Sequence, residues 1–167
     1  MTVHSEHPFL PPPEARNRIR QLRGRLVAPV TIVTAGEDGM TASAVLVVEG
    51  DPPRLVATIS ELADFRDAVE RTRAFVMHVA GQDHRHLADR FAEIAPSPGG
   101  LFHGLTMIET EWGPRISGLD TWAGCTLESV FTVGYQLLVV GMIEHLEVGE
   151  LDDPLIYFRG RYRKLAR

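Results

Sequence analysis

The feature that most constrains this fold is a series of short β-branched segments separated by turns. Strands are expected at 26–34, 41–48 and 54–59, with turns at 36–39 and 50–53. Three strands joined by such short turns favour an antiparallel meander over a βαβ unit. Further strands are expected at 74–79, 106–110, 121–133, 137–148 and 155–158. The sequence therefore predicts a mainly β protein built around a small barrel.

A few peripheral helices are expected outside this barrel. One covers residues 13–25, a second runs from Asp64 to Arg73 with Asp64 as its cap, and a third runs from about Asp83 to Glu93. The inward faces should be Phe65, Ala68, Val69 and Thr72 in the second helix and Leu87, Phe91 and Ile94 in the third. Strands and helices do not alternate, and no Gly-x-Gly-x-x-Gly follows a strand, so a Rossmann fold is disfavoured.

Length and composition indicate one intracellular domain. A chain of 167 residues suits a single domain, which we place at 14–167 behind a flexible leader at 1–13. The leader lacks the layout of a secretory signal, and no apolar run approaches a membrane span. Cys125 is the single cysteine, so a reducing, cytoplasmic location is expected. The net charge is -5 and no basic stripe occurs, which argues against nucleic acid as a partner.

Residues 39–44 are small or short, which makes them the first candidate binding segment. Thr41, Ala42, Ser43 and Ala44 would leave the backbone of a strand accessible from one face. A flat heterocycle could lie against such a strand and bond its N–H and C=O groups. On composition alone, a strand kept thin for packing is the more common explanation.

Two further segments could border a ligand. Residues 58–66 run from a strand into a helix start, where free N–H groups and the helix dipole suit a phosphate. Ser60 and Arg66 could add hydrogen bonds or charge there. Phe102 and His103 lie beside Gly104 after a Pro/Gly loop and could edge a pocket, although without other support an ordinary loop with a packed Phe is favoured.

Metal-binding, acyl-transfer and reactive-thiol sites find little support in the sequence. The seven histidines are scattered, one cysteine cannot build a zinc site, and no metal is expected. No Gly-x-Ser-x-Gly nucleophile elbow is present. Cys125 lies in an apolar strand and is expected to be inert core.

In combination, the segments resemble the flavin reductase-like, FMN-binding split-barrel family. The resemblance covers roughly Leu26 to Leu165, and its strength lies in the order of individually weak motifs. Those motifs are 30–34, 39–44, 51–53, 75–79 with Gln82, 87–92, 102–104 and 154–162.

The resemblance implies a split β-barrel homodimer with FMN, or alternatively FAD, in a groove near the subunit interface. It places the flavin ring beside Thr41, Ala42, Ser43 and Ala44, and the phosphate at the turn containing Ser60, Ala63, Asp64 and Arg66. Phe102 and Gly104 would border the ring, and Arg159 would lie nearby. Independently, the apolar strands from Thr121 to Val148 suggest a flank that a second subunit would cover.

The resemblance further implies an NAD(P)H-dependent flavin reductase or the reductase component of a flavin-dependent monooxygenase, with the protein positioning the flavin. It assigns no catalytic side chain here. Ala63 and Asp64 replace the Ser and Thr hydroxyls common at the phosphate turn, and Gln136 replaces a histidine found in many reductases. The alternatives are a non-catalytic FMN-carrying protein and a deazaflavin-dependent split-barrel oxidoreductase.

Overall fold

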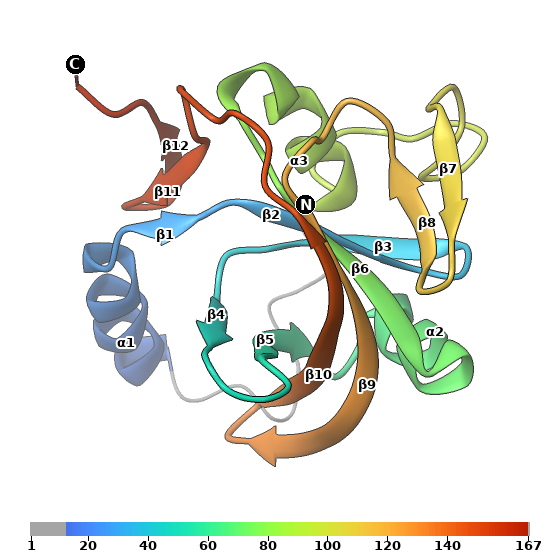
Figure 1. Ribbon diagram of the computed structural model, residues 1–167. Coiled ribbons are helices and arrows are strands. Elements are labelled where there is room, and N and C mark those ends of the chain that lie inside the picture. The colour runs from blue at the N-terminus through green and yellow to red at the C-terminus, as the bar shows by residue number, and fades with distance from the viewer. Residues whose placement is uncertain (1–12, 167) are drawn as a thin grey trace.

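A seven-stranded antiparallel sheet dominates the computed structural model, which describes residues 13–166 (Figure 1). Its strand order is β3-β2-β6-β9-β10-β5-β4. The strands are β2 (Thr31–Ala35), β3 (Asp38–Ala42), β4 (Val45–Val48), β5 (Arg54–Ser60), β6 (Ala74–Val79), β9 (Trp122–Val133) and β10 (Gln136–Glu147). The mainly β prediction with a few helices is therefore confirmed.

Two small sheets flank the large one. β1 (Ala28–Pro29), β11 (Ile156–Phe158) and β12 (Arg161–Arg163) form one, and β7 (Met107–Thr110) pairs with β8 (Gly113–Ile116) in the other. The helical elements are α1 (Pro13–Arg25), α2 (Asp64–Thr72), the 3-10 turn η1 (Gln82–His84) and α3 (Arg85–Phe91). The sequence reasoning missed β8 and β12, which are only four and three residues long.

The segment 26–34, expected as one strand, is divided at Val30. Its first part pairs with β11 and its second part enters the large sheet. Val30 is buried; its N–H donates to the carbonyl of Leu155, and its carbonyl accepts from Ala80. The chain changes sheets here because both backbone groups of Val30 have partners outside the large sheet.

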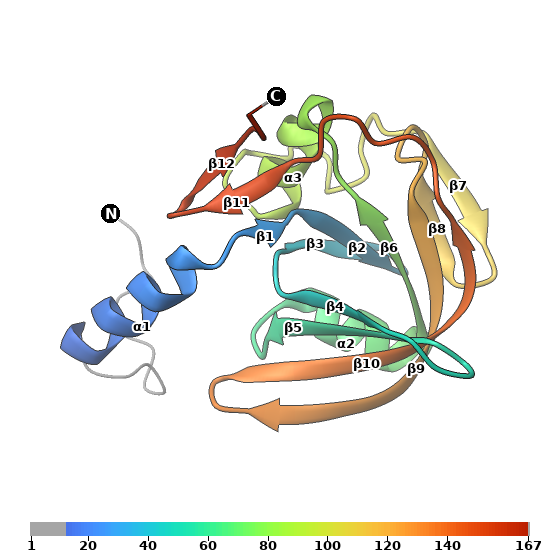
Figure 2. The same cartoon turned by 60° about the vertical axis from the view of Figure 1, so that its left-hand side comes forward.

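The segment 41–48 is also divided, and this division shapes the site. β3 ends at Ala42, the chain bends at Ser43, and β4 begins at Val45. β3 and β4 form the two opposite edges of the seven-stranded sheet, so the sheet curls to let a two-residue link join them (Figure 2). The N–H of Thr58 donates to the carbonyl of Ala44 at 3.0 Å, which anchors the link to β5.

Helix α2 lies against the core through Phe65, Ala68 and Val69, as predicted. Thr72 is exposed instead, and its hydroxyl bonds backbone carbonyls. The predicted cap is wrong: the N-cap is Ala63 in extended conformation with no capping side chain, and Asp64 is the first helical residue.

Helix α3 is shorter than expected because it ends at Phe91. Leu87 and Phe91 are buried, but Ile94 lies beyond the helix and is 73% exposed. The aromatic ring of Phe91 packs so close to β3 that a Cβ added to Gly39 would lie 2.7 Å from it. Glycine at position 39 thus permits the contact between α3 and β3.

The main core lies between the inner face of the sheet and α2, and includes Phe75, Leu55 and Ile59. A second cluster around Ile32, Phe91 and Ile116 joins α3 to the β7–β8 hairpin. Within residues 13–166, no helix has both the length and the apolar character needed to cross a bilayer. Residues 1–12 of the expected leader lie outside the described residues.

Candidate functional site

The small-residue link between β3 and β4 is exposed to solvent. Ser43 and Ala44 are exposed, whereas Ala42 is 3% exposed and its carbonyl accepts the hydroxyl of Thr31. Thr41 is half-buried and its hydroxyl donates to the carbonyl of Ala88 at 2.6 Å. Ser43 and Ala44 are therefore the solvent-accessible residues of this segment, while Thr41 and Ala42 hold the link in place.

The turn from β5 into α2 presents free helix amides. Ser60 is exposed and its hydroxyl accepts the N–H of Leu62 at 3.3 Å. Because Ala63 offers no side-chain acceptor, the first N–H groups of α2, at Asp64 and Phe65, have no capping partner in the turn. The uncapped amides form an electropositive point beside an exposed serine.

Arg66 is the basic side chain of this turn. Its Nε atom lies 3.5 Å from Oε1 of Glu70 on the same helix, and the two side chains are 41% and 42% exposed. Nε has no hydrogen-bond partner among the described residues, so this pair is a loose ion pair rather than an aligned bond.

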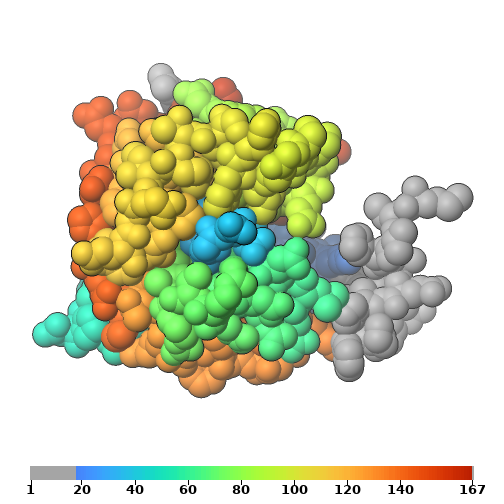
Figure 3. Space-filling model, turned by 90° about the vertical axis from the view of Figure 1, so that its right-hand side faces the viewer, coloured from blue at the N-terminus to red at the C-terminus, as the bar shows by residue number. Residues whose placement is uncertain are grey.

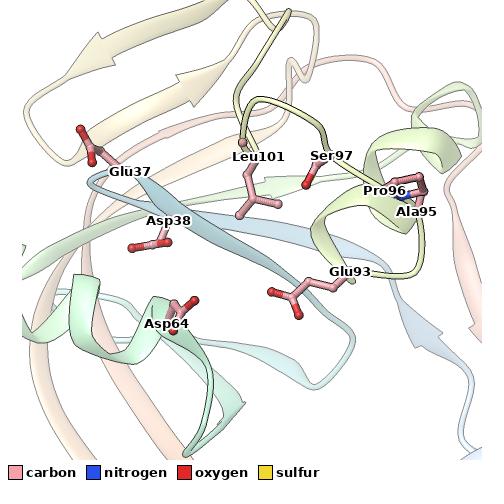
Figure 4. A pocket seen from close by; sticks show the side chains of 9 residues that line it. Glu37, Asp38, Asp64, Glu93, Ala95, Pro96, Ser97 and Leu101 are labelled. Carbon is pink, nitrogen blue, oxygen red and sulfur yellow. The ribbon is translucent and has the colours of Figure 1, made fainter. Parts of the chain in front are cut away.

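A hollow of about 500 Å³ opens between three elements. The β2–β3 turn lies recessed at its floor, between α2 and the segment that follows α3 (Figure 3). Carboxylates line it: Glu37 and Asp38 from the β2–β3 hairpin, Asp64 from α2 and Glu93 from the segment after α3. Figure 4 shows Asp38, Asp64 and Glu93 directed into the same space.

The clustering of these acids affects the pKa of Asp38. Partial burial and then the charge of Asp64 raise the pKa of Asp38 above its ordinary value, and Arg71 only partly opposes them. Glu37 and Asp67 push the pKa in the same upward direction. The hollow is therefore negative, and its carboxylates are short of cationic partners.

Ser97, Gly100 and Leu101 line the far wall of the hollow, and the loop at 97–104 that carries them is held firmly. Phe102 packs on Phe91 with ring centroids 5.9 Å apart. The guanidinium of Arg90 donates to the carbonyls of Gly100 and His103 at 2.8 and 2.7 Å. Gly104 has a φ of 74° and open space beside it, so a side chain there would be strained. The backbone of this loop is thus fixed, and the predicted site residues Phe102 and Gly104 belong to it without lining the hollow.

Arg159 lies apart from the other predicted site residues. It occupies the β11–β12 turn, its guanidinium lies 5.4 Å from the ring centre of Phe158, and its N–H donates to the carbonyl of Gly24 in α1. Figures 1 and 2 both separate this turn from α2. A single copy of the chain therefore does not bring Arg159 to the β5–α2 turn.

The lining acids Asp38 and Glu93 were missed by sequence reasoning. Asp38 was assigned to a hairpin turn and Glu93 to the end of a helix, and both assignments concern local structure only. Their meeting depends on how α3 packs across β3. No local signal in the sequence encodes that contact.

Metal and thiol chemistry find no support in the described part of the chain. Residues 13–166 contain no group of three or more ligating side chains suited to a metal ion. Burial raises the pKa of Cys125 to about 12, and its side chain is inaccessible. The thiol is therefore inert core, as expected.

Comparison with known proteins gives a consistent family match. The family model described as "Flavin reductase like domain" matches residues 23–166. The reductase component of 4-hydroxyphenylacetate 3-monooxygenase from Thermus thermophilus is 30% identical over 155 residues, covering 90% of this chain and 97% of that protein. An NADH:FMN oxidoreductase from Rhodococcus qingshengii is 29% identical over 143 residues, covering 81% and 74% of the two chains.

Solved structures match in fold. The flavin reductase PheA2 superimposes with a TM-score of 0.82 at 24% identity, over 90% of this chain and 98% of that one. The NADH:FAD oxidoreductase SgcE6 of Streptomyces globisporus gives 0.83 at 21% identity, over 97% and 100%. At these identities the superpositions support the architecture of the large sheet and its helices.

Proposed function

The chain belongs to the flavin reductase-like domain family, and from that premise we propose that it is an NAD(P)H-dependent flavin reductase. The relatives named as monooxygenase reductase components indicate a flavin-dependent monooxygenase as the recipient of its product. The observation that carries the proposal is the exposed pair of small residues, Ser43 and Ala44, that joins β3 to β4, together with the uncapped start of α2, whose Asp64 lines a hollow of about 500 Å³.

The described residues fit a flavin in shape. Small side chains at Ser43 and Ala44 leave room for a planar ring against the backbone, and the free amides of Asp64 and Phe65 suit a phosphate. When bound, the flavin would accept a hydride from the nicotinamide and supply the redox chemistry. The protein's part is to position it and exclude competing contacts.

Each proposed contact follows from the side chain's surroundings. Thr41 and Ala42 would act as backbone support, because the Thr41 hydroxyl is already bonded to Ala88. At the phosphate end we assign Ser60, Arg66 and the main chain of Ala63 and Asp64, since the Asp64 carboxylate repels an anion. Phe102 and Gly104 would border the ring, and Arg159 would take part only through another copy of the chain.

Several finer properties belong to the same proposal. We assign FMN as the flavin, although relatives include an FAD enzyme. We assign residues 14–167 to one split-barrel domain, supported by the family match to residues 23–166 and by the curled sheet whose edges are joined at Ser43 and Ala44. The free, buried Cys125 suits a reducing cytoplasm.

A homodimer is the proposed assembly. Phe131, Val133 and Tyr135 at the β9–β10 turn are each more than half exposed. In β4, Leu46 and Val47 are 66% and 63% exposed. Because they are neighbours in a strand, their side chains point to opposite faces of the sheet. Both faces of this edge strand are thus uncovered, as expected where a second subunit packs.

An absorbance spectrum with FMN, followed by anaerobic titration with NADH and NADPH, tests the function. We expect bound flavin to bleach on addition of one nicotinamide, with one reduced flavin formed per nicotinamide consumed. Bound FMN that stays oxidised would favour an FMN carrier instead, with Gln136 at the start of β10 as the structural reason. Preference for a deazaflavin over FMN would contradict the flavin assignment.

A further inference from the structure

The tip of the β7–β8 hairpin is fastened to the large sheet by a tryptophan. Trp112 lies in the turn between the two strands, and its indole Nε1 donates to Oε2 of Glu144 on β10 at 2.8 Å. The same oxygen accepts the hydroxyl of Thr126 on β9, also at 2.8 Å. Gly124 gives the indole its place on β9, because a Cβ added there would overlap the ring. One side chain of the hairpin thus contacts both long strands of the sheet.

A β-bulge brings two consecutive side chains of β10 to this tryptophan. The register between β9 and β10 shifts just before His145, which pairs with Gly124, and Glu144 has no partner in the ladder. Neighbouring residues of a regular strand point to opposite faces of the sheet, and an extra residue changes that alternation. The carboxylate of Glu144 and the imidazole of His145 therefore both contact Trp112.

The imidazole of His145 contacts two indoles and a carboxylate. Its ring centre lies 5.4 Å from that of Trp112, with 20° between the ring planes, and 4.8 Å from that of Trp122 at 35°. These are the two tryptophans of the chain. Nε2 of His145 lies 3.4 Å from Oε1 of Glu147, and the two side chains are 41% and 53% exposed. The imidazole is therefore held in place and still reached by water.

Protonation of His145 should strengthen its contact with the hairpin. An imidazolium is attracted to the faces of indole rings and to carboxylates. Two carboxylates of its own strand lie beside it, those of Glu144 and Glu147. Hydrogen bonds from Trp112 and then from Thr126 lower the pKa of Glu144, so its carboxylate stays charged where histidine gains a proton.

One cation opposes this proton. The guanidinium of Arg115 on β8 lies 5.2 Å from the ring centre of Trp122, and its charge repels an imidazolium. Exposed Glu111 precedes Trp112 and adds a negative charge at the hairpin tip, and the β9 residues that contact this place are uncharged. We expect two indoles and two adjacent carboxylates to outweigh one guanidinium, so that acid favours the closed tip.

The base of the hairpin is anchored independently of this contact. The hydroxyl of Thr34 donates to the carbonyl of Pro114 at 2.6 Å, and the N–H of Ile116 donates to His78 at 3.0 Å. Both hydrogen bonds are buried. Since they hold β8 on the large sheet, a change at His145 should affect the tip of the hairpin rather than the whole of it.

We propose that Trp112, Trp122 and His145 form a pH-sensitive clasp, in which protonation of His145 closes the tip of the β7–β8 hairpin on the β10 bulge. Near neutral pH the tip opens more often, and in mild acid the imidazolium holds the indole in place. None of the clasp residues is assigned to the proposed flavin site, so this inference stands or falls independently of flavin binding.

Hydrogen–deuterium exchange at the hairpin tip measures the clasp. The amides of Glu111 and Trp112 are compared at about pH 7.5 and about pH 5.5, on either side of the ordinary histidine titration, after correction for intrinsic exchange rates. We expect protection to rise about twofold to fivefold at the lower pH, as for an exposed cation–π contact. A general loss of stability in acid would lower protection and cannot produce this rise.

Two substitutions of His145 separate its charge from its shape. His145→Gln cannot take up a proton, so protection should stay low at both pH values. His145→Arg is charged at both and stacks well on aromatic rings, so protection should stay high. His86→Gln changes an exposed histidine on α3 and should retain the wild-type rise. A rise in His145→Gln as large as in the wild type, or a fall in the wild type, would overturn the clasp.

Gly124→Ala tests whether the contact with Trp112 is the cause. The added methyl group displaces the indole while His145 and both carboxylates remain, so the rise in protection should disappear. Trp112→Leu should give the same result without adding an atom to β9. Tryptophan fluorescence checks the displacement, because both tryptophans belong to the clasp. A full rise in protection in both variants would contradict the proposal.

Discussion

Two polar regions of this molecule contrast sharply: the buried His78 and the acidic hollow. His78 is fully buried on β6, where Nδ1 donates to the carbonyl of Ile32 and Nε2 accepts the N–H of Ile116. Both bonds are at most 3.0 Å long, and together they join β6, β2 and β8. In the hollow, the carboxylates of Asp38 and Asp64 repel each other. The chain itself supplies both hydrogen-bond partners of His78, whereas the carboxylates of the hollow are left for a ligand or partner to bind.

The contrast indicates where stability and function reside. A buried polar group with both hydrogen bonds made stabilises a unique packing, and removing it leaves unpaired backbone groups. An open, like-charged hollow stabilises nothing by itself, so it suits a binding role. Substitutions at His78 should therefore affect folding, and substitutions around the hollow should affect ligand binding.

The largest effect is expected from His78→Leu. The change leaves the carbonyl of Ile32 and the N–H of Ile116 buried without partners, at a cost of about 1–3 kcal/mol each. Urea denaturation should show a free energy of unfolding lower by roughly 2–5 kcal/mol. Asp64→Asn is the matched control, and its free energy of unfolding should stay close to that of the wild type. Equal destabilisation by the two substitutions would contradict the assignment of stability to His78 and of binding to the hollow.

Acid should destabilise the protein through the same histidine. Burial, aided by the charge of Arg115, lowers the pKa of His78 to about 4 despite the bond to Ile32. Below pH 6.5 the unfolded chain binds a proton that the folded chain does not, so stability falls as pH falls from about 6.5 to about 4. The loss should reach roughly 3 kcal/mol in the wild type. A similar loss over this range in His78→Leu would assign the effect to other groups.

Ser43→Trp should damage binding without damaging the fold. Ser43 is exposed at the bend between β3 and β4, so an indole there fills the space proposed for the flavin ring and disturbs no core contact. FMN affinity should fall at least about tenfold, or about 1.4 kcal/mol. The far-UV spectrum and urea midpoint should stay near wild type; unchanged flavin content would refute the ring's placement.

The smallest effect is expected from Asp64→Asn. Removing this charge should lower the pKa of Asp38, which NMR titration of its carboxyl group can follow. FMN should bind about twofold to threefold more tightly, because an exposed like charge beside the phosphate is lost. Glu49→Gln, an exposed change outside the lining of the hollow, should alter neither quantity.

Local sequence signals predicted most elements but not their junctions. Turn residues and β-branched runs located β5, β6 and the β2–β3 turn closely, since those signals act within a few residues. The breaks at Val30 and Ser43 escaped because each depends on pairing with a distant strand. Of the four residues expected to be accessible, Ser43 and Ala44 are exposed, whereas Thr41 is half-buried and Ala42 is buried, and the expected continuous strand was wrong.

In the candidate site, too, residues in local patterns could be predicted, whereas residues that meet through long-range packing could not. Ser60 and Arg66 could be proposed from the sequence because a strand-to-helix turn is a local pattern, and the structure places both at such a turn. The acidic character of the hollow was not, since Asp38 and Glu93 meet only when α3 packs on β3. Arg159 entered through family resemblance, and the structure of one copy places it beside the C-terminal end of α1, apart from the β5–α2 turn. Periodicity in the sequence does not show which charged side chains from separate elements come together in the fold.

Hydrogen–deuterium exchange with and without FMN tests the central claim most directly, because it locates the ligand independently of turnover. The account predicts slowed exchange at Ser43 and Ala44 and at the uncapped amides of Asp64 and Phe65, with no change in the β7–β8 hairpin. Protection confined to regions away from the β3–β4 link and the α2 start would contradict it.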